Sequence, residues 1–135
     1  MRVTLYLHCS AIEKAIVFYV EELALFDVAE NYGTGYCLFE SRLLKGFHLY
    51  LADWCNPAGN EYIFSLDVSD CDTEFLRLRS ICFSSGRRIL PDENGYIGVL
   101  EYPGGKVFQM TDPDNNRFTI SERYKGDDDV ANAAD

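Results

Sequence analysis

The feature that most constrains the fold is an order of secondary-structure elements that occurs twice along the chain. Residues 3–9 alternate apolar and polar side chains, which predicts a strand, and apolar residues then recur at helical spacing from 11 to 23. Three further extended segments are predicted, at 26–30, 36–41 and 47–52. The same order restarts at Tyr62, about 59 residues after Val3, so the sequence predicts two tandem βαβββ modules.

Local signals mark the ends of these elements. Ser10, followed three residues later by Glu13, predicts a capping box for the first helix, and Ser69 or Asp70 is expected to cap the second. The strands of the second module are predicted at 62–68, 88–90, 96–102, 106–111 and 117–122.

The predicted fold class is α+β. Each module has one helix to cover one face of its strands, so we expect a curved mixed sheet around a cleft, with the helices on the outer face. At 135 residues the chain is long enough for one domain with a sizeable core. We assign this single domain to 1–125, with module one at about 1–55, a linker at 54–60 and module two at about 61–125, and we expect 126–135 to form a disordered acidic tail.

Composition excludes several classes of function. The formal charge of −10, without a long basic cluster, argues against a nucleic-acid partner. No apolar run approaches the length of about 20 residues that a membrane helix needs, so we expect no membrane partner. The five cysteines form no Cys-x-x-Cys pair, which favours free thiols in a cytoplasmic protein. Nucleotide-binding loops, hydrolase elbows and zinc-protease motifs are absent from the sequence.

Three short segments carry a resemblance to a known family. The segment AIEKAIVFY at 11–19 resembles the helix-opening segment, ending in Phe-Tyr, of the vicinal oxygen chelate superfamily. VSDCD at 68–72 is similar to the start of its second helix, and DPDNNRF at 112–118 to its Asp-Pro-Asp-Gly-Asn turn before the last strand. The resemblance covers residues 3–123. It implies the fold and a homodimer, because members often pair modules across chains, but the superfamily includes both enzymes and drug-sequestering proteins.

In the metalloenzymes of that superfamily, one side chain from the first and one from the last strand of each module hold a divalent metal. Counted from the matching motifs, these positions fall on Thr4 and His48 in the first module and on Ile63 and Thr119 in the second. Only His48 is a normal ligand, whereas a catalytic divalent metal takes about three protein ligands. We therefore expect no metal and no cofactor.

The predicted cleft combines polar and aromatic side chains. Alternation along the strands, together with the loop that follows 47–52, gives the candidate ligand-binding residues: His48, Tyr50, Tyr6, Trp54, Thr4, Ile63, Ser65, Asp67, Thr119 and Ser121. His48 is a candidate hydrogen-bond donor or general base, or a histidine satisfied by a neighbour. Tyr6 and Tyr50 are candidate stacking groups, Trp54 a mobile lid or a staple between modules, and Asp67 a partner for a cationic group or a helix cap.

These features favour a binding protein over an enzyme. The leading hypothesis is metal-independent binding of a small aromatic or cationic molecule, resembling drug or metabolite sequestration of the bleomycin-resistance type. One alternative is a metal-dependent lyase, isomerase or dioxygenase of the glyoxalase type, with His48 as one ligand and other donors outside the family positions. The other is a homodimeric interaction module with a vestigial cleft.

Overall fold

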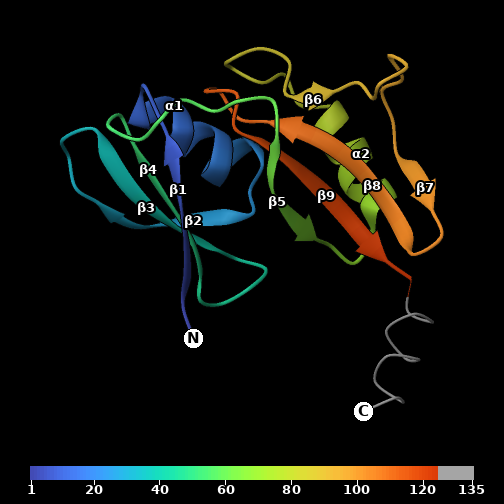
Figure 1. The fold of residues 1–135 in the computed structure, drawn as a ribbon, viewed down its shortest axis with the longest axis horizontal. Coiled ribbons are helices and arrows are strands. Elements are labelled where there is room, and N and C mark those ends of the chain that lie inside the picture. Colours follow the sequence, from blue (N-terminus) through green and yellow to red (C-terminus); the bar gives the residue numbers. More distant parts are fainter. Residues whose placement is uncertain (125–135) are drawn as a thin grey trace.

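The first module has the predicted order of elements in the computed structural model, which describes residues 1–124 (Figure 1). Its elements are β1 Val3–His8, α1 Ile12–Ile16, η1 Val17–Glu22, β2 Phe26–Asn31, β3 Tyr36–Ser41 and β4 Phe47–Ala52. The strands form a four-stranded sheet in the order β1-β4-β3-β2, in which β1 and β4 are parallel. The predicted acidic tail at 126–135 lies outside the described residues.

The first helix differs from the prediction at both ends. Its second half, η1, is a π-helix, in which Leu23 donates its backbone N–H to the carbonyl of Phe18 at 2.7 Å. The capping-box prediction is wrong, because the N-cap is Ala11 and no side chain caps the helix. Ser10 instead donates its Oγ to Asp114 at 2.7 Å, and thereby ties the start of α1 to the second module.

The second module repeats the order with an extra short strand. Its elements are β5 Tyr62–Asp67, α2 Cys71–Arg79, β6 Ile89–Leu90, β7 Leu100–Tyr102, β8 Gly105–Thr111 and β9 Arg117–Arg123. Its sheet has the order β5-β9-β8-β6, and β7 pairs with β8. Asp70 caps α2 by accepting the backbone N–H of Thr73 at 3.0 Å, as predicted. The strand predicted at 96–102 is confined to β7, because Asp92 and Tyr96 close a loop through backbone hydrogen bonds.

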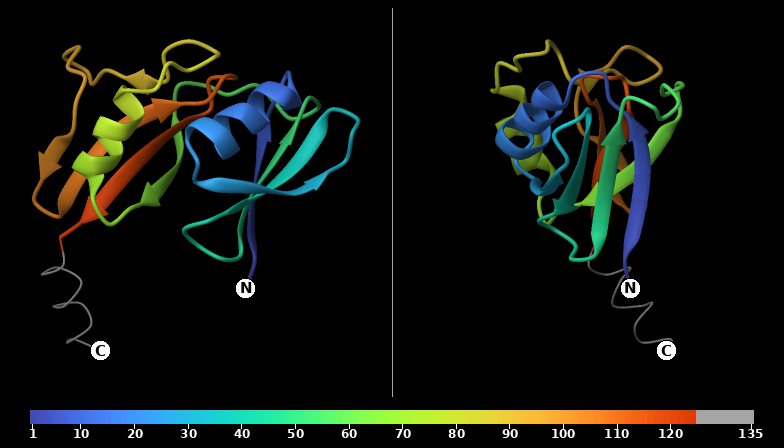
Figure 2. Two further views of the ribbon diagram at one scale, coloured as in Figure 1. Left: turned by 180° about the vertical axis from the view of Figure 1, so that it is seen from behind. Right: turned by 90° about the vertical axis from the view of Figure 1, so that its left-hand side faces the viewer.

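The fold class is α+β, as predicted, with two βαβββ modules. Both helices lie on one side of the two mixed sheets, and the opposite sheet faces are left uncovered (Figure 2). The helix-side faces carry the apolar residues of the alternating strands, including Leu49, Leu51, Phe118 and Ile120, which are fully buried. These side chains belong to one core cluster that includes both modules.

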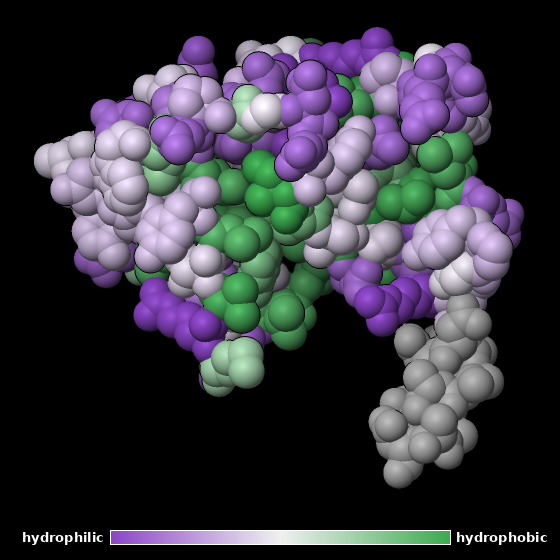
Figure 3. All heavy atoms as spheres, viewed as in Figure 1, coloured by the Kyte–Doolittle hydropathy of each residue, from purple (hydrophilic) through white to green (hydrophobic). Residues whose placement is uncertain are grey.

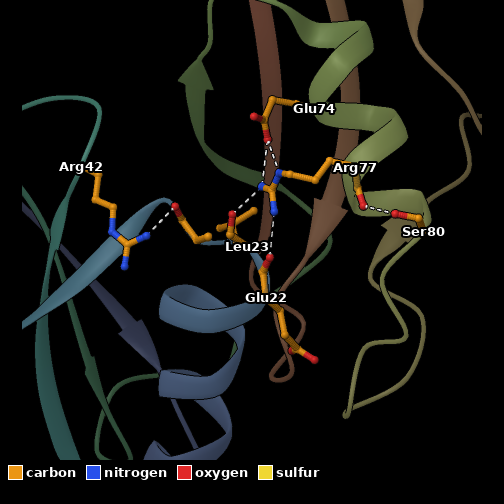
Figure 4. Close-up of polar contacts among 7 residues, drawn as sticks. Glu22, Leu23, Arg42, Glu74, Arg77 and Ser80 are labelled. Atoms are coloured by element: carbon orange, nitrogen blue, oxygen red, sulfur yellow. Dashed lines mark hydrogen bonds and ion pairs between the residues drawn. The ribbon is translucent and has the colours of Figure 1, made fainter.

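Polar contacts also join the modules. Arg77 of α2 donates from its guanidinium to the carbonyl of Glu22 at 3.1 Å and to that of Leu23 at 2.6 Å (Figure 4). These carbonyls lie at the end of η1, where helical partners are missing, so Arg77 acts as a C-cap supplied by the other module. Glu74 holds Arg77 in place through an ion pair of 2.8 Å.

A buried network forms a second connection. Tyr19, on η1, donates its hydroxyl to the carboxylate of Asp112 at 2.7 Å, and both side chains are almost fully buried. Asn116 donates to the same carboxylate at 2.8 Å and to the carbonyl of His8 at 2.9 Å. No helix within residues 1–124 is long and apolar enough to cross a membrane.

Candidate functional site

The uncovered face of the first sheet brings residues from four strands into register. The pairing aligns Thr4 of β1, His48 of β4 and Glu40 of β3 in one row across the sheet. The next row on this face contains Tyr6 of β1 and Tyr50 of β4. Because neighbouring residues across a sheet point to the same face, these side chains share the side opposite the helices.

Five aromatic rings form a cluster on this face. Tyr50 lies at its centre, with ring centroids 5.2 Å from Tyr6, 6.2 Å from Tyr36, 6.1 Å from Tyr32 and 5.8 Å from Trp54. Tyr6 and Trp54 are 63% and 62% exposed, so the rings at the edge present free surface to a ligand. Partial desolvation, followed by the neighbouring Tyr36 and Tyr32, raises the pKa of Tyr50, which keeps this phenol neutral.

His48 and Glu40 form the polar end of the face. The Nε2 atom of His48 lies 3.1 Å from a carboxylate oxygen of Glu40, and the histidine side chain is only 9% exposed. Its Nδ1 atom is buried and has no hydrogen-bond partner among the described residues. Because Glu40 occupies Nε2, Nδ1 is the ring nitrogen left without a protein partner among the described residues.

Charge on this face is mostly negative. Glu30 is paired in register with Leu38, and Asp27 with Glu40, so both acids lie on the same side as the aromatic cluster. Arg42 neutralises Asp27 through an ion pair of 2.8 Å and also donates to the carbonyl of Ala24. The remaining carboxylates, Glu30 and Glu40, favour a neutral or cationic ligand over an anion.

The uncovered face of the second sheet carries several hydrogen-bonding side chains together with Tyr102. Ser65 and Ser121 lie 2.9 Å apart through their hydroxyl oxygens, and Ser121 donates to Asp67 at 2.5 Å. Arg123 lies 3.6 Å from the same carboxylate. These side chains line a cavity of about 460 Å³ together with Thr119.

An apolar groove separates the two sheets. A cavity of about 620 Å³ is lined by the start of β1, by the loop that connects β3 and β4, and by β5. Its apolar walls include Leu43, Leu44, Phe47 and Phe64, and the hollow is visible as the green region between the modules in Figure 3. Ser65 and Asp67 line both this groove and the polar cavity, so the two lie next to each other along β5.

The donors at the family's metal positions do not fit a catalytic metal. Thr4 lies opposite His48, and the register places Ser65, rather than Ile63, opposite Thr119. Hydroxyl groups and one imidazole do not replace the three or so histidine or carboxylate ligands that such a metal takes. No three His, Cys, Asp or Glu side chains of residues 1–124 are grouped closely enough to hold a metal ion.

The structure divides the ten predicted site residues into two groups. Thr4, Tyr6, His48, Tyr50 and Trp54 lie together on the first sheet and the loop after it. Ser65, Asp67, Thr119 and Ser121 line the polar cavity, and Ile63 lies at an irregularity in β5 where the pairing register shifts.

Sequence reasoning missed the contribution of β3. Tyr36 and Glu40 alternate on that strand, and Tyr32 precedes it, but their side of the sheet becomes clear only from the pairing of β3 with β4. The alternation Tyr36, Leu38, Glu40 was the available signal.

Comparisons with solved structures agree with this architecture, whereas no family model and no curated protein matches the chain. Among solved structures, TnmS3, an antibiotic binding protein from Streptomyces sp. CB03234, is 24% identical, covers 92% of this chain and 96% of its own, and superposes with a TM-score of 0.70. A glyoxalase/bleomycin resistance protein from the same strain is 25% identical, with 92% and 100% covered and a TM-score of 0.65. Lactoylglutathione lyase from Agrobacterium tumefaciens is 14% identical, with 90% and 92% covered and a TM-score of 0.63.

These structures define the class. The chain has the vicinal oxygen chelate fold of the glyoxalase/bleomycin resistance protein/dioxygenase superfamily, as its motifs predicted. The neighbours include an antibiotic-binding protein and a lyase, so the side chains of the site, and not the fold, have to decide between binding and catalysis.

Proposed function

We propose that this protein binds a planar aromatic small molecule, and preferentially a cationic one, without a metal ion. The observation that carries the proposal is the cluster of five rings around Tyr50 on the uncovered face of the first sheet. A strand tyrosine that serves only the core is covered by its neighbours, whereas Tyr6 and Trp54 keep most of their surface free.

The preference for a cation follows from the same face. Aromatic rings attract a cation by about 0.5–2 kcal/mol each, depending on solvent exposure. Glu30 and Glu40 lie beside the rings, and Arg42 is already engaged by Asp27. A planar cation therefore gains both stacking and charge attraction, whereas a planar anion gains only stacking.

His48 supplies a specific hydrogen bond in this proposal. Its buried Nδ1 lacks a partner within the described chain, so a small shift of the ring would let it form a hydrogen bond with a polar group of the ligand. Glu40 supports that role because it occupies Nε2. The pair orients a ligand in this view and transfers no proton.

A second copy of the chain is proposed to close the site. The aromatic cluster lies on an uncovered sheet face, and small-molecule sites bury most of the surface of their ligand. The polar face of the second module, with Ser65, Ser121 and Arg123, is uncovered as well. In a homodimer, the polar face of one copy would cover the aromatic face of the other, which light scattering coupled to size exclusion would detect as twice the monomer mass.

The test is a titration of the full chain with a planar cation, such as proflavine, followed by calorimetry and by the fluorescence of Trp54. Matched probes separate the contribution of stacking from that of charge: anthraquinone-2-sulfonate is planar but anionic, and tetramethylammonium is cationic but not planar. We expect saturable binding of proflavine and much weaker binding of both controls.

Variants locate the site. Tyr6→Ala should weaken proflavine binding by about three- to thirtyfold, the equivalent of one lost ring contact. Trp54→Ala, measured by calorimetry, should have a similar effect. Tyr96→Ala is the matched control, because Tyr96 is 56% exposed and lies outside the cluster. Equal losses from Tyr6→Ala and Tyr96→Ala would refute the site.

Elemental analysis and the same titration separate the two alternatives. A metal-dependent lyase, isomerase or dioxygenase requires a stoichiometric transition metal in protein purified without chelators, which elemental analysis measures. An interaction module with a vestigial cleft would show no saturable response to any planar compound.

A further inference from the structure

A third cavity lies away from both uncovered sheet faces, at the end of α2. It has a volume of about 480 Å³ and is formed by the last turn of α2, the loop that leads to β6, and Ile97. The loop carrying residues 80–88 lies beside α2 and β6 (Figure 1). This cavity shares no residue with the aromatic cluster, the polar cavity or the apolar groove.

The floor of this cavity is apolar. Leu78 and Ile89 are buried at its base, Phe83 packs against Phe18 of the first module at 6.0 Å, and Ile97 remains 39% exposed. Such a surface favours the apolar part of a ligand, and the volume lies in the range of small-molecule sites.

The rim of the cavity carries three arginines in a chain whose net charge is −10. Arg79, Arg87 and Arg88 form no ion pair with any carboxylate of residues 1–124. The nearby Glu22 accepts the backbone N–H of Ser84 at 2.8 Å through one carboxylate oxygen, and its other oxygen is buried without a partner among the described residues.

The three guanidinium groups have different roles. Arg88 donates to the carbonyls of Gly86, Ser85 and Asp112, so it holds the loop and contributes its charge. Arg87 donates only its Nε, to the carbonyl of Ile89 at 3.3 Å, which leaves its two terminal nitrogens free. Arg79 lies over the ring of Phe75 at 5.8 Å, an arrangement that leaves its N–H edge available.

The geometry points to a binding site for a small organic carboxylate with an apolar body. Arg87 and Arg79 would bind the carboxylate through charge-assisted hydrogen bonds, and Leu78, Ile89 and Ile97 would contact the apolar part. The proposal does not depend on the function proposed for the aromatic face. The ligand of this cavity is an anion, whereas the aromatic face is proposed to prefer a cation.

The test is calorimetry of the full chain with octanoate, acetate and octanamide. Octanoate has both the carboxylate and the apolar body, whereas acetate lacks the body and octanamide lacks the charge. We expect saturable octanoate binding at one site, and affinities at least about tenfold weaker for acetate and octanamide, since a hydrogen bond to a charged group is worth well over a factor of ten in affinity.

Three variants assign the residues. Arg87→Met and Arg79→Met keep the length and the apolar stem of the side chain, and each should weaken octanoate binding by about fivefold or more. Ile97→Ser should weaken octanoate without changing the response to acetate. Arg2→Met is the matched control, because Arg2 is exposed and forms no ion pair within residues 1–124.

Four calorimetric results would overturn the proposal: no saturable octanoate binding, equal affinity for octanamide, unchanged affinity in both arginine variants, or an equal loss in the Arg2→Met control. Sedimentation with phosphatidylglycerol vesicles distinguishes a free carboxylate from a lipid surface, and binding to the vesicles alone would also contradict it. Proflavine binding should be unaffected by octanoate, so each proposal can fail without the other.

Discussion

Tyr19→Phe removes one hydroxyl from the buried network that joins the modules. The lost hydrogen bond is 2.7 Å long and its acceptor is the carboxylate of Asp112. Asp112 is only 1% exposed. A hydrogen bond to a charged group contributes about 1.5–3 kcal/mol. We therefore expect the free energy of unfolding to fall by about 2 kcal/mol, measured by urea denaturation followed by far-UV circular dichroism.

The remaining partners of Asp112 set the upper limit of this loss. Asn116 donates to the carboxylate through both its side chain and its backbone N–H, and Asp114 donates its backbone N–H at 2.9 Å. The carboxylate therefore stays partly satisfied in Tyr19→Phe. Tyr6→Phe is the control, because Tyr6 is exposed and should change stability by less than about 0.5 kcal/mol. A Tyr19→Phe loss no larger than the control would refute the role of the network.

The stabilisation by Tyr19 should also depend on pH. Burial, and then the charge of Asp112, raises the pKa of Tyr19 well above its usual value near 10. A group with a raised folded-state pKa contributes stability that is fully present below its unfolded pKa and is lost as the pH rises through the folded value. The wild-type chain should therefore lose about 1.4 kcal/mol per pH unit above pH 10 from this residue, and Tyr19→Phe should not. The difference between the two proteins, constant from pH 7 to 9, should shrink from pH 10 to 11.

Three further changes test other parts of the structure. Arg77→Met removes the C-cap that α2 supplies to the carbonyl of Glu22, and should lower the unfolding free energy by about 1–3 kcal/mol in the same urea assay; Arg77→Lys should restore less than half of it. Gly105→Ala places a Cβ atom 1.9 Å from the carbonyl oxygen of Glu122, so it should cost more than about 2 kcal/mol, whereas Gly59→Ala, which meets no atom within 4 Å, should cost little. Dialysis against a chelator should leave proflavine affinity unchanged, and a loss that zinc or manganese restores would contradict metal-independent binding.

Much of the fold could be predicted because turn-rich segments mark where strands begin and end. The strands 36–41 and 47–52 match the structure because the turn-rich stretches 31–35 and 42–46, which precede them, can be read from the sequence. The helix cap could not be predicted, since Ser10 has an equally good partner in Asp114, which lies 104 residues away along the chain. A local motif does not report a competing partner that only tertiary packing provides.

The sequence predicted which residues of a strand share a face, but it did not predict which strands lie next to each other. Alternation identified Tyr6 and Tyr50 as residues of one face, but the cluster also requires Tyr36 from β3, which depends on the pairing between strands. The prediction for the second module also differs from the structure, because Ser65, and not Ile63, lies opposite Thr119. The count back from Val68 placed this position two residues too early along β5, and only the observed pairing with β9 gives the correct partner.

The two uncovered faces have diverged in chemistry while keeping one architecture. The first presents rings and a histidine–carboxylate pair, and the second presents hydroxyls held by Asp67 and Arg123. A ligand with a flat body and polar substituents would use both kinds of surface, because rings recognise shape whereas hydroxyls recognise direction. The proposed pairing of two copies would place these two unlike faces against each other.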